Sequence, residues 1–434
     1  MSKTMRFFSK HKFMFSCFTM IIIFQLAGNG DRIPIHYDNL CYTFHIVDFS
    51  LGFISKVLPG QIFMWIFKNP TVELYKAYSI ALLAILCLII SYFLEKIYLC
   101  APKEYKTTYA YVIVLFCASG FVFNMFFCAI GIIDVYWIVA VVAFFLSLQS
   151  KKTWFLIPVC FLFLVFVHYG AMLCYIPLLS IILLYEASNL EGKDKKIILA
   201  ILAISIVLSV GFVLVFLYNE SHMDDWTKEK LHSFIESRGG TVYIFYDYVV
   251  LKEMDLTKWG VDILIKQSEL FNFSFLPNFL NGFLNRFAYQ LYLNYQMTLA
   301  FVQKLVDNIL WIYASIVLVG IPYVYFYYKC CRQLYKRCEN KLKKFSLFCA
   351  LALFIIAFFS LTILSMDKVR YSHHSIICIF VFFLYIMFRE KDTFAEIVSS
   401  NMKKINLIHL LLFLVTAFLL RCYPYIDLFE VKIL

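Results

Sequence analysis

Charged residues are scarce in this sequence of 434 residues, where aspartate, glutamate, lysine and arginine together make up 15%. Soluble globular proteins average about 25% charged and roughly 45–50% apolar residues. Here hydrophobic residues make up 62%, and the mean hydropathy is +0.79. Because no single soluble core can bury so much apolar surface, the composition excludes an ordinary soluble domain and indicates a membrane protein.

The sequence also lacks the polar–apolar alternation of an outer-membrane barrel, and it has no internal repeat, low-complexity tract or lipidation motif. It contains 14 cysteines, but no CxxC pair with zinc-type partners. Most of these cysteines, such as Cys87, Cys117 and Cys160, lie in apolar runs, where a thiol behaves as a small hydrophobic side chain. The sequence therefore predicts α-helical spans and no metal site.

Apolar stretches long enough to cross roughly 30 Å of hydrocarbon recur along the chain. We predict an all-α polytopic membrane protein with about eleven transmembrane helices, forming a single integral membrane domain over 1–434. The predicted spans are 13–28, 74–95, 109–129, 132–149, 153–168, 170–186, 197–218, 308–328, 346–365, 375–389 and 405–420.

Lysine and arginine between the spans predict the orientation. Basic residues gather in the N-terminal segment and in 151–152, 193–196, 329–344 and 389–404, which fall on one side if the N-terminus is inside. This cytoplasmic side accounts for the net charge of +11 without a nucleic-acid partner. We therefore predict a multi-pass protein of the cytoplasmic (inner or plasma) membrane. The weak cleavage sequence QLAGNGD favours an uncleaved first span over a signal peptide.

Two segments between spans are long, 29–73 and 219–307, and both are predicted to lie outside. In the first, the apolar stretch 49–67 is interrupted by Lys56 and by Pro59 with Gly60, so it predicts a helix lying in the membrane interface. The second is rich in aromatic residues and too long for a connector, which predicts a cap on the outer membrane surface.

Ionisable residues gather at the predicted outer level, on separate spans and loops. Among them, DKVRYSHH (367–374) is predicted to be an outside loop. The candidates are Asp38, Asp48, Asp134, His168, Arg286, Asp367, Lys368 and Arg370. Charge near hydrocarbon costs several kcal/mol unless it faces a wet cavity lined by protein. We therefore expect these side chains to share one pocket that opens to the outside.

The residue types in this pocket suit a particular substrate. A carboxylate can accept a proton from an attacking hydroxyl, and arginine offers a planar fork to phosphate oxygens. Interfacial helices and the abundant phenylalanine and tyrosine suit a lipid tail and the faces of sugar rings. A saccharide linked to polyprenyl phosphate combines these features.

Three segments carry a resemblance to a known group: VDFSLGFISKVLPG (47–60), VHYGAMLCYIPLL (167–179) and DKVRYSHH. Together with the general layout, they resemble bacterial membrane proteins of surface-polysaccharide loci, namely EpsG-like and Wzy-like (O-antigen-type) polymerases and GT-C-type glycosyltransferases. The resemblance implies a GT-C-like architecture, in which an acidic residue after the first span is the catalytic base. Asp31, Asp38 and Asp48 occupy that position here.

The sequence leaves simpler roles open for several candidates. Asp48 and Asp134 could cap the helices that follow them, since aspartate is a favoured N-cap residue. His168 could be an ordinary hydrogen-bonded histidine at the interface. Asp367 and Arg370, three residues apart, could simply pair with each other.

The leading hypothesis is an inverting membrane glycosyltransferase or polysaccharide polymerase, with a lipid-linked saccharide donor and a glycan acceptor. In it, Asp48 or Asp38 takes the proton of the acceptor hydroxyl. Arg370, with Lys368 or Arg286, holds the departing phosphate. The alternatives are a flippase or transporter of lipid-linked saccharide, or a non-catalytic component of exopolysaccharide assembly. No cofactor is predicted, and assistance by a divalent cation is left open.

Overall fold

The computed structural model describes residues 7, 9–28, 39–51, 56–68, 71–128, 130–221, 233, 235–239, 318, 320–364, 368–403 and 411. Over these residues the chain is helical and contains no strand, which confirms the all-α class. The first half contains α2 (Lys12–Gly28), α3 (Asn39–Ile46), η1 (Phe49–Leu51), α4 (Leu58–Ile66), α5 (Val72–Cys100), η2 (Lys103–Tyr105), α6 (Lys106–Ala118), α7 (Gly120–Cys128) and α8 (Val135–Leu148). The second contains η3 (Lys151–Leu156), α9 (Ile157–Val167), η4 (Tyr169–Leu173), α10 (Tyr175–Ser188), α11 (Gly192–Ser221), α17 (Ile321–Arg337), α18 (Lys341–Leu364), α19 (Lys368–Arg389) and α20 (Thr393–Met402).

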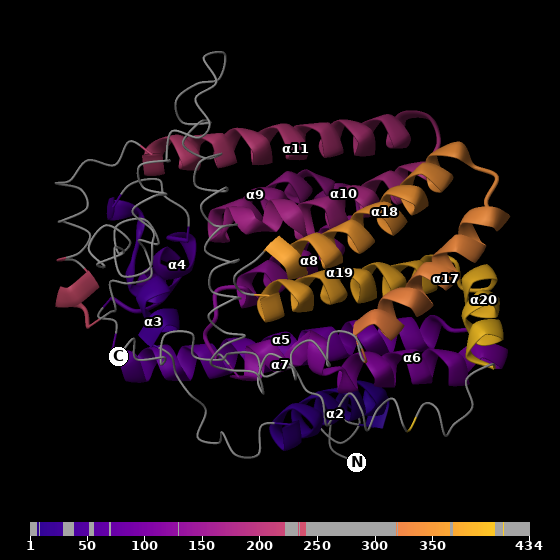
Figure 1. Ribbon diagram of the computed structural model, residues 1–434, viewed down its shortest axis with the longest axis horizontal. Helices are drawn as coiled ribbons and strands as arrows, with labels where there is room; N and C mark the ends of the chain where they lie inside the picture. The colour runs from indigo at the N-terminus through magenta and orange to yellow at the C-terminus, as the bar shows by residue number, and fades with distance from the viewer. Residues whose placement is uncertain are drawn as a thin grey trace.

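The long helices lie side by side in a bundle (Figure 1). In this view α11 forms one edge, followed by α9 and α10, then α18 and α19, and then α5 to α7, with α2 at the opposite edge. The short helices α3 and α4 lie at one end of the bundle, and α20 lies at the other end. The buried side chains form one apolar core that extends from α2 to α20.

Helices α10 and α19 run in the same direction at the centre of this bundle. The Tyr175 hydroxyl lies 2.7 Å from Nδ1 of His374 near the start of both helices. Eleven residues further along both, Tyr385 donates its hydroxyl to Glu186 at 2.8 Å. Two contacts with the same spacing require parallel helices in register, about 16 Å apart along the axis. The predicted spans 170–186 and 375–389 also run in the same direction, as the even-numbered members of the predicted series.

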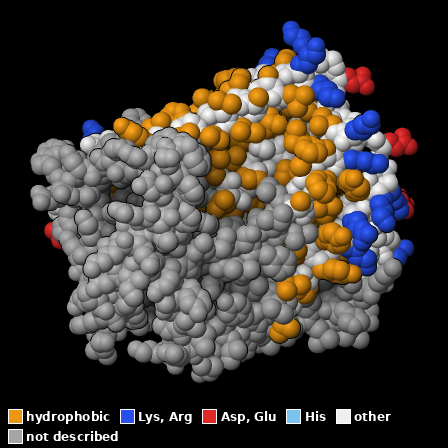
Figure 2. All heavy atoms as spheres, turned by 45° about the horizontal axis from the view of Figure 1, so that its top comes forward, with side chains coloured by type: hydrophobic (Ala, Val, Ile, Leu, Met, Phe, Trp, Pro, Cys, Tyr) orange, Lys and Arg blue, Asp and Glu red, His pale blue; other side chains and the backbone are white. Residues whose placement is uncertain are grey.

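Exposed lysine and arginine side chains gather at the end where α8, α10 and α19 finish. We call this set the basic rim: Lys151, Lys152, Lys193, Lys196, Lys336, Arg337, Lys341 and Lys391. Polar contacts join the segments that carry it, including an ion pair of Lys151 with Asp194 and a bond from Asn340 to the Ser188 carbonyl. In Figure 2 the basic side chains gather along one edge of an apolar surface. The predicted basic segments thus meet at one end of the molecule.

Two helices of the described chain, α5 and α11, are long and apolar enough to cross a membrane. Only 33% of the most apolar window of α5, and 22% of that of α11, is buried. The helices over 132–149, 153–168 and 170–186 have 14, 11 and 14 residues in α-helical form, fewer than the about 20 that a bilayer requires. Most of 308–328 and all of 405–420 except residue 411 lie outside the described residues.

Several predicted boundaries are wrong. The stretch 109–129 is not one helix, because Ser119 has an extended ψ of 117° and separates α6 from α7. Segment 329–344 is not a loop, because α17 and α18 continue into it and only 338–340 separate them. DKVRYSHH is not a loop between spans, because α19 begins at Lys368. Long helices therefore replace two of the polar connections that the charge pattern suggested.

The predicted interfacial helix over 49–67 is also shorter than expected. It consists of the turn η1 and the separate helix α4, which starts at Leu58 with Pro59 in its first turn. Lys56 has a left-handed φ of 73° between them. Gly60, the last glycine of the 47–60 motif, lies against α3, because a Cβ built on it would lie 1.8 Å from the Val47 carbonyl oxygen. This glycine permits the close approach of two backbones.

Gly60→Ala should lower the free energy of unfolding by about 1–3 kcal/mol, because the added methyl group forces α4 away from the Val47 carbonyl. Thermal unfolding of the purified protein in detergent measures the loss. Gly211→Ala in α11 is the matched control, since a Cβ there meets no atom within 4 Å, and helix propensity favours alanine. Equal melting temperatures for Gly60→Ala and the wild type would contradict the close packing of α3 on α4.

Candidate functional site

A chain of three polar side chains is buried where α8, α10 and α19 begin. Nε2 of His374 lies 2.8 Å from Oδ2 of Asp134, and its Nδ1 lies 2.7 Å from the Tyr175 hydroxyl. Asp134, Tyr175 and His374 are each 0% exposed. We call these three residues the relay. Because a buried carboxylate is stabilised by a donor, the Asp134 carboxylate accepts Nε2–H, which leaves the Nδ1 lone pair to accept from Tyr175.

The backbone before α8 places Asp134 in the relay. Gly131 adopts a left-handed φ of 91° and lies against the Tyr75 ring, and the Tyr75 hydroxyl donates to the Ile130 carbonyl at 3.2 Å. This turn ends the apolar segment before Val135, so that Asp134 occupies the N-cap position of α8. Its side chain makes no capping hydrogen bond to α8. Instead it reaches His374, so the simpler role of helix cap is not the one this carboxylate has.

Trp137 covers the relay and connects it to His168. Its ring lies edge-on to His374, with centroids 4.9 Å apart, and edge-on to His168 at 5.9 Å. The indole donates to the Leu164 carbonyl at 3.2 Å, which fixes its position. Nδ1 of His168 accepts the Gly170 N–H at 2.8 Å. The structure therefore brings His168 to the aromatic ring that also contacts His374, the hydrogen-bond partner of Asp134.

On its other side, the start of α8 contacts a further buried histidine, His45 in α3. Its Nδ1–H donates to the Cys41 carbonyl at 2.8 Å, and the ring lies among aromatic rings that include Tyr136 and Tyr78. The hydroxyls of Tyr78 and Tyr136 are 2.8 Å apart. Burial lowers the pKa of His45 to about 4, so this histidine is neutral near pH 7.

Asp48 has a structural environment of its own. Its carboxylate accepts the Ser50 N–H at 2.8 Å, which closes the turn η1, and Oδ2 lies 3.6 Å from Nη1 of Arg238. Arg238 also donates to the Ile46 carbonyl at 2.7 Å. Asp48 therefore caps a short turn, not α4. Its contact with Arg238 also joins the long segment 29–73 to the long segment 219–307. The neighbouring Phe49 ring lies 6.1 Å from that of Phe166, near the end of α9.

The remaining predicted residues divide into two groups. Lys368 and Arg370 belong to the first turn of α19, and Arg370 is one helical turn before His374. Asp38, Arg286 and Asp367 lie outside the described residues.

Three residues of this site were not apparent from the sequence, namely Tyr175, Trp137 and His374 as a partner of Asp134. The four-residue spacing of Arg370 and His374 is a helical signal that could have placed this histidine.

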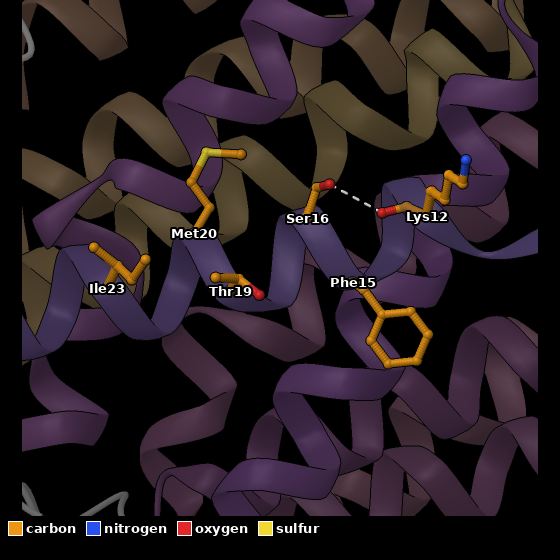
Figure 3. A pocket seen from close by; sticks show the side chains of 6 residues that line it. All are labelled: Lys12, Phe15, Ser16, Thr19, Met20 and Ile23. Atoms are coloured by element: carbon orange, nitrogen blue, oxygen red, sulfur yellow. Dashed lines mark hydrogen bonds between the residues drawn. The ribbon is translucent and has the colours of Figure 1, made fainter. Parts of the chain in front are cut away.

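No group of three histidine, cysteine, aspartate or glutamate side chains in the described part of the chain is placed to hold a metal ion. A hollow of about 620 Å³ lies along α2 (Figure 3), and none of the three relay residues lines it. Six side chains of α2 line it: Lys12, Phe15, Ser16, Thr19, Met20 and Ile23. Ser16 Oγ donates to the Lys12 carbonyl at 2.9 Å, so this hydroxyl is satisfied within its own helix.

The relay can accept and hold a proton. A neutral His374 with Nε2–H on Asp134 can take a proton at Nδ1, and the carboxylate then stabilises the imidazolium. Burial strengthens this pairing, since the effective dielectric constant inside a protein is far below that of water.

Comparisons with protein-family models, curated proteins and solved structures found no match for this chain. The chemistry of the site therefore rests on its own geometry.

Coupling along the relay can be measured with a double-mutant cycle. Tyr175→Phe removes the hydroxyl that bonds to His374, and Asp134→Asn removes the charge at the other end of the relay. We expect a coupling free energy of about 0.5–3 kcal/mol between them in chemical unfolding, because both act through one imidazole.

Tyr185→Phe is the matched control for this cycle. Tyr185 lies ten residues beyond Tyr175 in α10, and its hydroxyl donates to Glu390 and not to the relay. The effect of Tyr185→Phe should therefore add to that of Asp134→Asn. Additive effects of Tyr175→Phe and Asp134→Asn would show that the three side chains do not act together.

His45 should give the protein an acid-sensitive stability. Its folded-state pKa of about 4 lies below the ordinary value of 6.5, so the unfolded chain binds the proton more readily. This contribution is complete above pH 6.5, falls as the pH drops toward 4, and amounts to about 3 kcal/mol. Melting temperatures measured across this window for the wild type and His45→Gln test it. Identical pH profiles for the two proteins would refute the assignment.

Proposed function

We propose that this protein is a multi-pass enzyme of the cytoplasmic membrane that transfers a glycosyl group from a polyprenyl-phosphate-linked saccharide to a glycan acceptor. The observation that carries the proposal is the Asp134–His374–Tyr175 relay, buried at the end of the bundle opposite the basic rim. The proposed architecture has about eleven spans, the N-terminus inside and a GT-C-like arrangement, with 29–73 and 219–307 outside.

Exposed apolar surface supports the membrane location. A core helix of a soluble protein is mostly buried, whereas α11 leaves most of its apolar window exposed. Val207 is 69% exposed and Ile204 is 51% exposed on this helix. Apolar side chains in such numbers are stable only against lipid or another protein.

The basic rim supports the orientation. Positively charged segments stay on the cytoplasmic side of a membrane, so the rim end faces the cytoplasm and the relay end faces outward.

The lengths of the helices that carry the relay support its position within the depth of the membrane. Helices α8 and α10 are too short to cross the bilayer alone, and turns precede each of them at the relay end. Non-helical backbone at this depth is tolerated where it is buried in protein or lines a cavity.

In the proposed reaction, the acceptor hydroxyl oxygen attacks the anomeric carbon, and the bond from that carbon to the phosphate oxygen breaks. The polyprenyl phosphate group leaves with the electron pair. Tyr175 takes the proton of the acceptor hydroxyl as it passes its own proton to Nδ1 of His374. Asp134 holds Nε2–H and stabilises the imidazolium. Asp48, which already pairs with Arg238, is less suited to this task.

The sequence places two basic residues in the first turn of α19, one helical turn before His374. Lys368 and Arg370 belong to its first turn, and the partial positive charge of a helix N-terminus adds to theirs. We assign to Arg370 the stabilisation of charge on the departing phosphate, with Lys368 as a second cation. This assignment keeps donor phosphate and relay within about one helical turn of each other.

One observation favours a second candidate, a flippase for the same lipid-linked saccharide. The three relay residues are fully shielded from solvent, and buried carboxylate–histidine chains in membrane proteins also serve as proton relays in transporters. In that case a proton on His374 would bias the position of α19 relative to α8 and α10, and no glycosidic bond would form.

Reconstitution of the full chain into liposomes with polyprenyl-phosphate-linked saccharide and a glycan acceptor tests both candidates. The enzyme should extend or transfer the saccharide, as seen by chromatography of lipid-linked glycans. Tyr175→Phe and Asp134→Asn should each lower the rate about 10²- to 10⁴-fold, and Arg370→Ala should also lower it. Tyr185→Phe, at the far end of α10, should leave the rate unchanged.

Two outcomes would count against the transfer reaction. Wild-type rates in Tyr175→Phe and Asp134→Asn, both shown to be folded, would exclude the relay from catalysis. Movement of a fluorescent lipid-linked saccharide across the bilayer without a new glycosidic bond would identify the flippase instead.

A further inference from the structure

The basic rim is most concentrated where η3 and the start of α11 meet. Lys151 of η3 forms an ion pair with Asp194 of α11, which holds the two turns together. Ser150 Oγ accepts the Lys152 N–H at 3.3 Å and so fixes the turn before η3. Gly192, the first residue of α11, has a left-handed φ of 55° where the chain turns from α10 into α11. The two basic turns are therefore held in place by local contacts.

Positive charge exceeds negative charge in this part of the rim. The lysines are Lys151, Lys152, Lys193, Lys195 and Lys196, and the carboxylates beside them are Asp194 and Glu191. Asp194 is already paired with Lys151. Lys152, Lys193 and Lys196 are exposed and have no ion-pair partner among the described residues. Three cations are thus available to an anionic partner.

Apolar surface begins within one turn of these lysines on both elements. Phe155 is 69% exposed and Val159 is 56% exposed along η3 and α9. On α11, Ile197 follows Lys196 directly, and exposed apolar side chains continue to Val207 and beyond. Helices α9 and α11 pack against each other, and we call their exposed apolar residues the apolar strip. The apolar band beside the blue edge in Figure 2 shows this change from basic to apolar surface.

A strip of this kind fits one partner in particular. The most apolar window of α11 has 18 residues and spans about 27 Å, close to the thickness of a bilayer's hydrocarbon core. A phospholipid places a negatively charged phosphate directly beside its acyl chains. Lysines above an apolar strip match both parts in order, and their alkyl stems can lie along the strip while the ammonium groups reach the phosphate.

We propose that the junction of η3 and α11 binds an anionic phospholipid of the cytoplasmic leaflet. Lys152, Lys193 and Lys196 contact its headgroup phosphate, and its acyl chains lie along the exposed strip of α9 and α11. This inference rests on the proposed membrane location and orientation, and it does not depend on the transfer reaction. Glycosyl transfer and lipid binding can therefore fail independently of each other.

Native mass spectrometry of the full chain in detergent, titrated with dioleoylphosphatidylglycerol or dioleoylphosphatidylcholine, tests the proposal. The wild type should bind phosphatidylglycerol more tightly. The variant Lys152→Gln/Lys193→Gln/Lys196→Gln should weaken this binding about a hundredfold, since each lysine near an anionic lipid surface contributes roughly a factor of five. Binding of phosphatidylcholine should be unchanged.

The matched control is Arg332→Gln/Lys336→Gln/Lys341→Gln, which removes three exposed cations from α17 and α18 at the same end of the molecule. It lowers the net charge equally, and it should change phosphatidylglycerol binding less than fivefold. Thermal unfolding confirms that both variants are folded. Equal binding of the two lipids by the wild type, or equal weakening in the two variants, would overturn the proposal. Displacement of the lipid by millimolar inorganic phosphate would overturn it as well, because a free phosphate site would explain the charge.

Discussion

A carboxylate and an imidazole without access to water must find partners inside the protein, and in this bundle Asp134 and His374 find each other. The pair joins the start of α8 to α19, 240 residues apart in the sequence. Removing His374 would cost several kcal/mol, because the Asp134 carboxylate would be left buried without its donor. Tyr175 adds α10 to the same contact. The arrangement of the three central helices therefore depends on this interaction, and so does every role proposed for the site.

The two ends of the bundle differ in the kind of polar contact they contain. At the relay end, one carboxylate is enclosed with aromatic rings and two histidines, and Trp137 contacts both histidine rings. At the other end, Glu186 accepts from Tyr385 and pairs with Arg389, which is partly exposed. Here charge is neutralised by neighbouring cations and by water. This asymmetry gives the molecule a direction, which is the basis for placing chemistry at one end and lipid headgroups at the other.

The aromatic and apolar surroundings explain why the three relay side chains keep one arrangement. Trp137 is held by the Leu164 carbonyl and cannot turn away from His374 without losing that bond. His45, neutral and buried beside Tyr136, adds a second rigid contact to the start of α8. Gly60 permits the close approach of two backbones, and Gly131 leaves space for the Tyr75 ring. Glycines where chain segments come close and large aromatic residues around the relay thus together fix the positions of the relay side chains.

The sequence by itself determined the all-α class and the grouping of basic segments, because composition and charge are properties of the chain as a whole. It also made Asp134 and His168 candidates, since polar residues at the edges of apolar runs are visible in the sequence. It misjudged DKVRYSHH, where charged residues suggested a loop although a helix can carry them on its first turns. Only the tertiary structure decided that His374 pairs with Asp134 and that Asp48 pairs with Arg238. Local patterns carry no information about which distant helix lies opposite a side chain, because that choice depends on how the whole bundle packs.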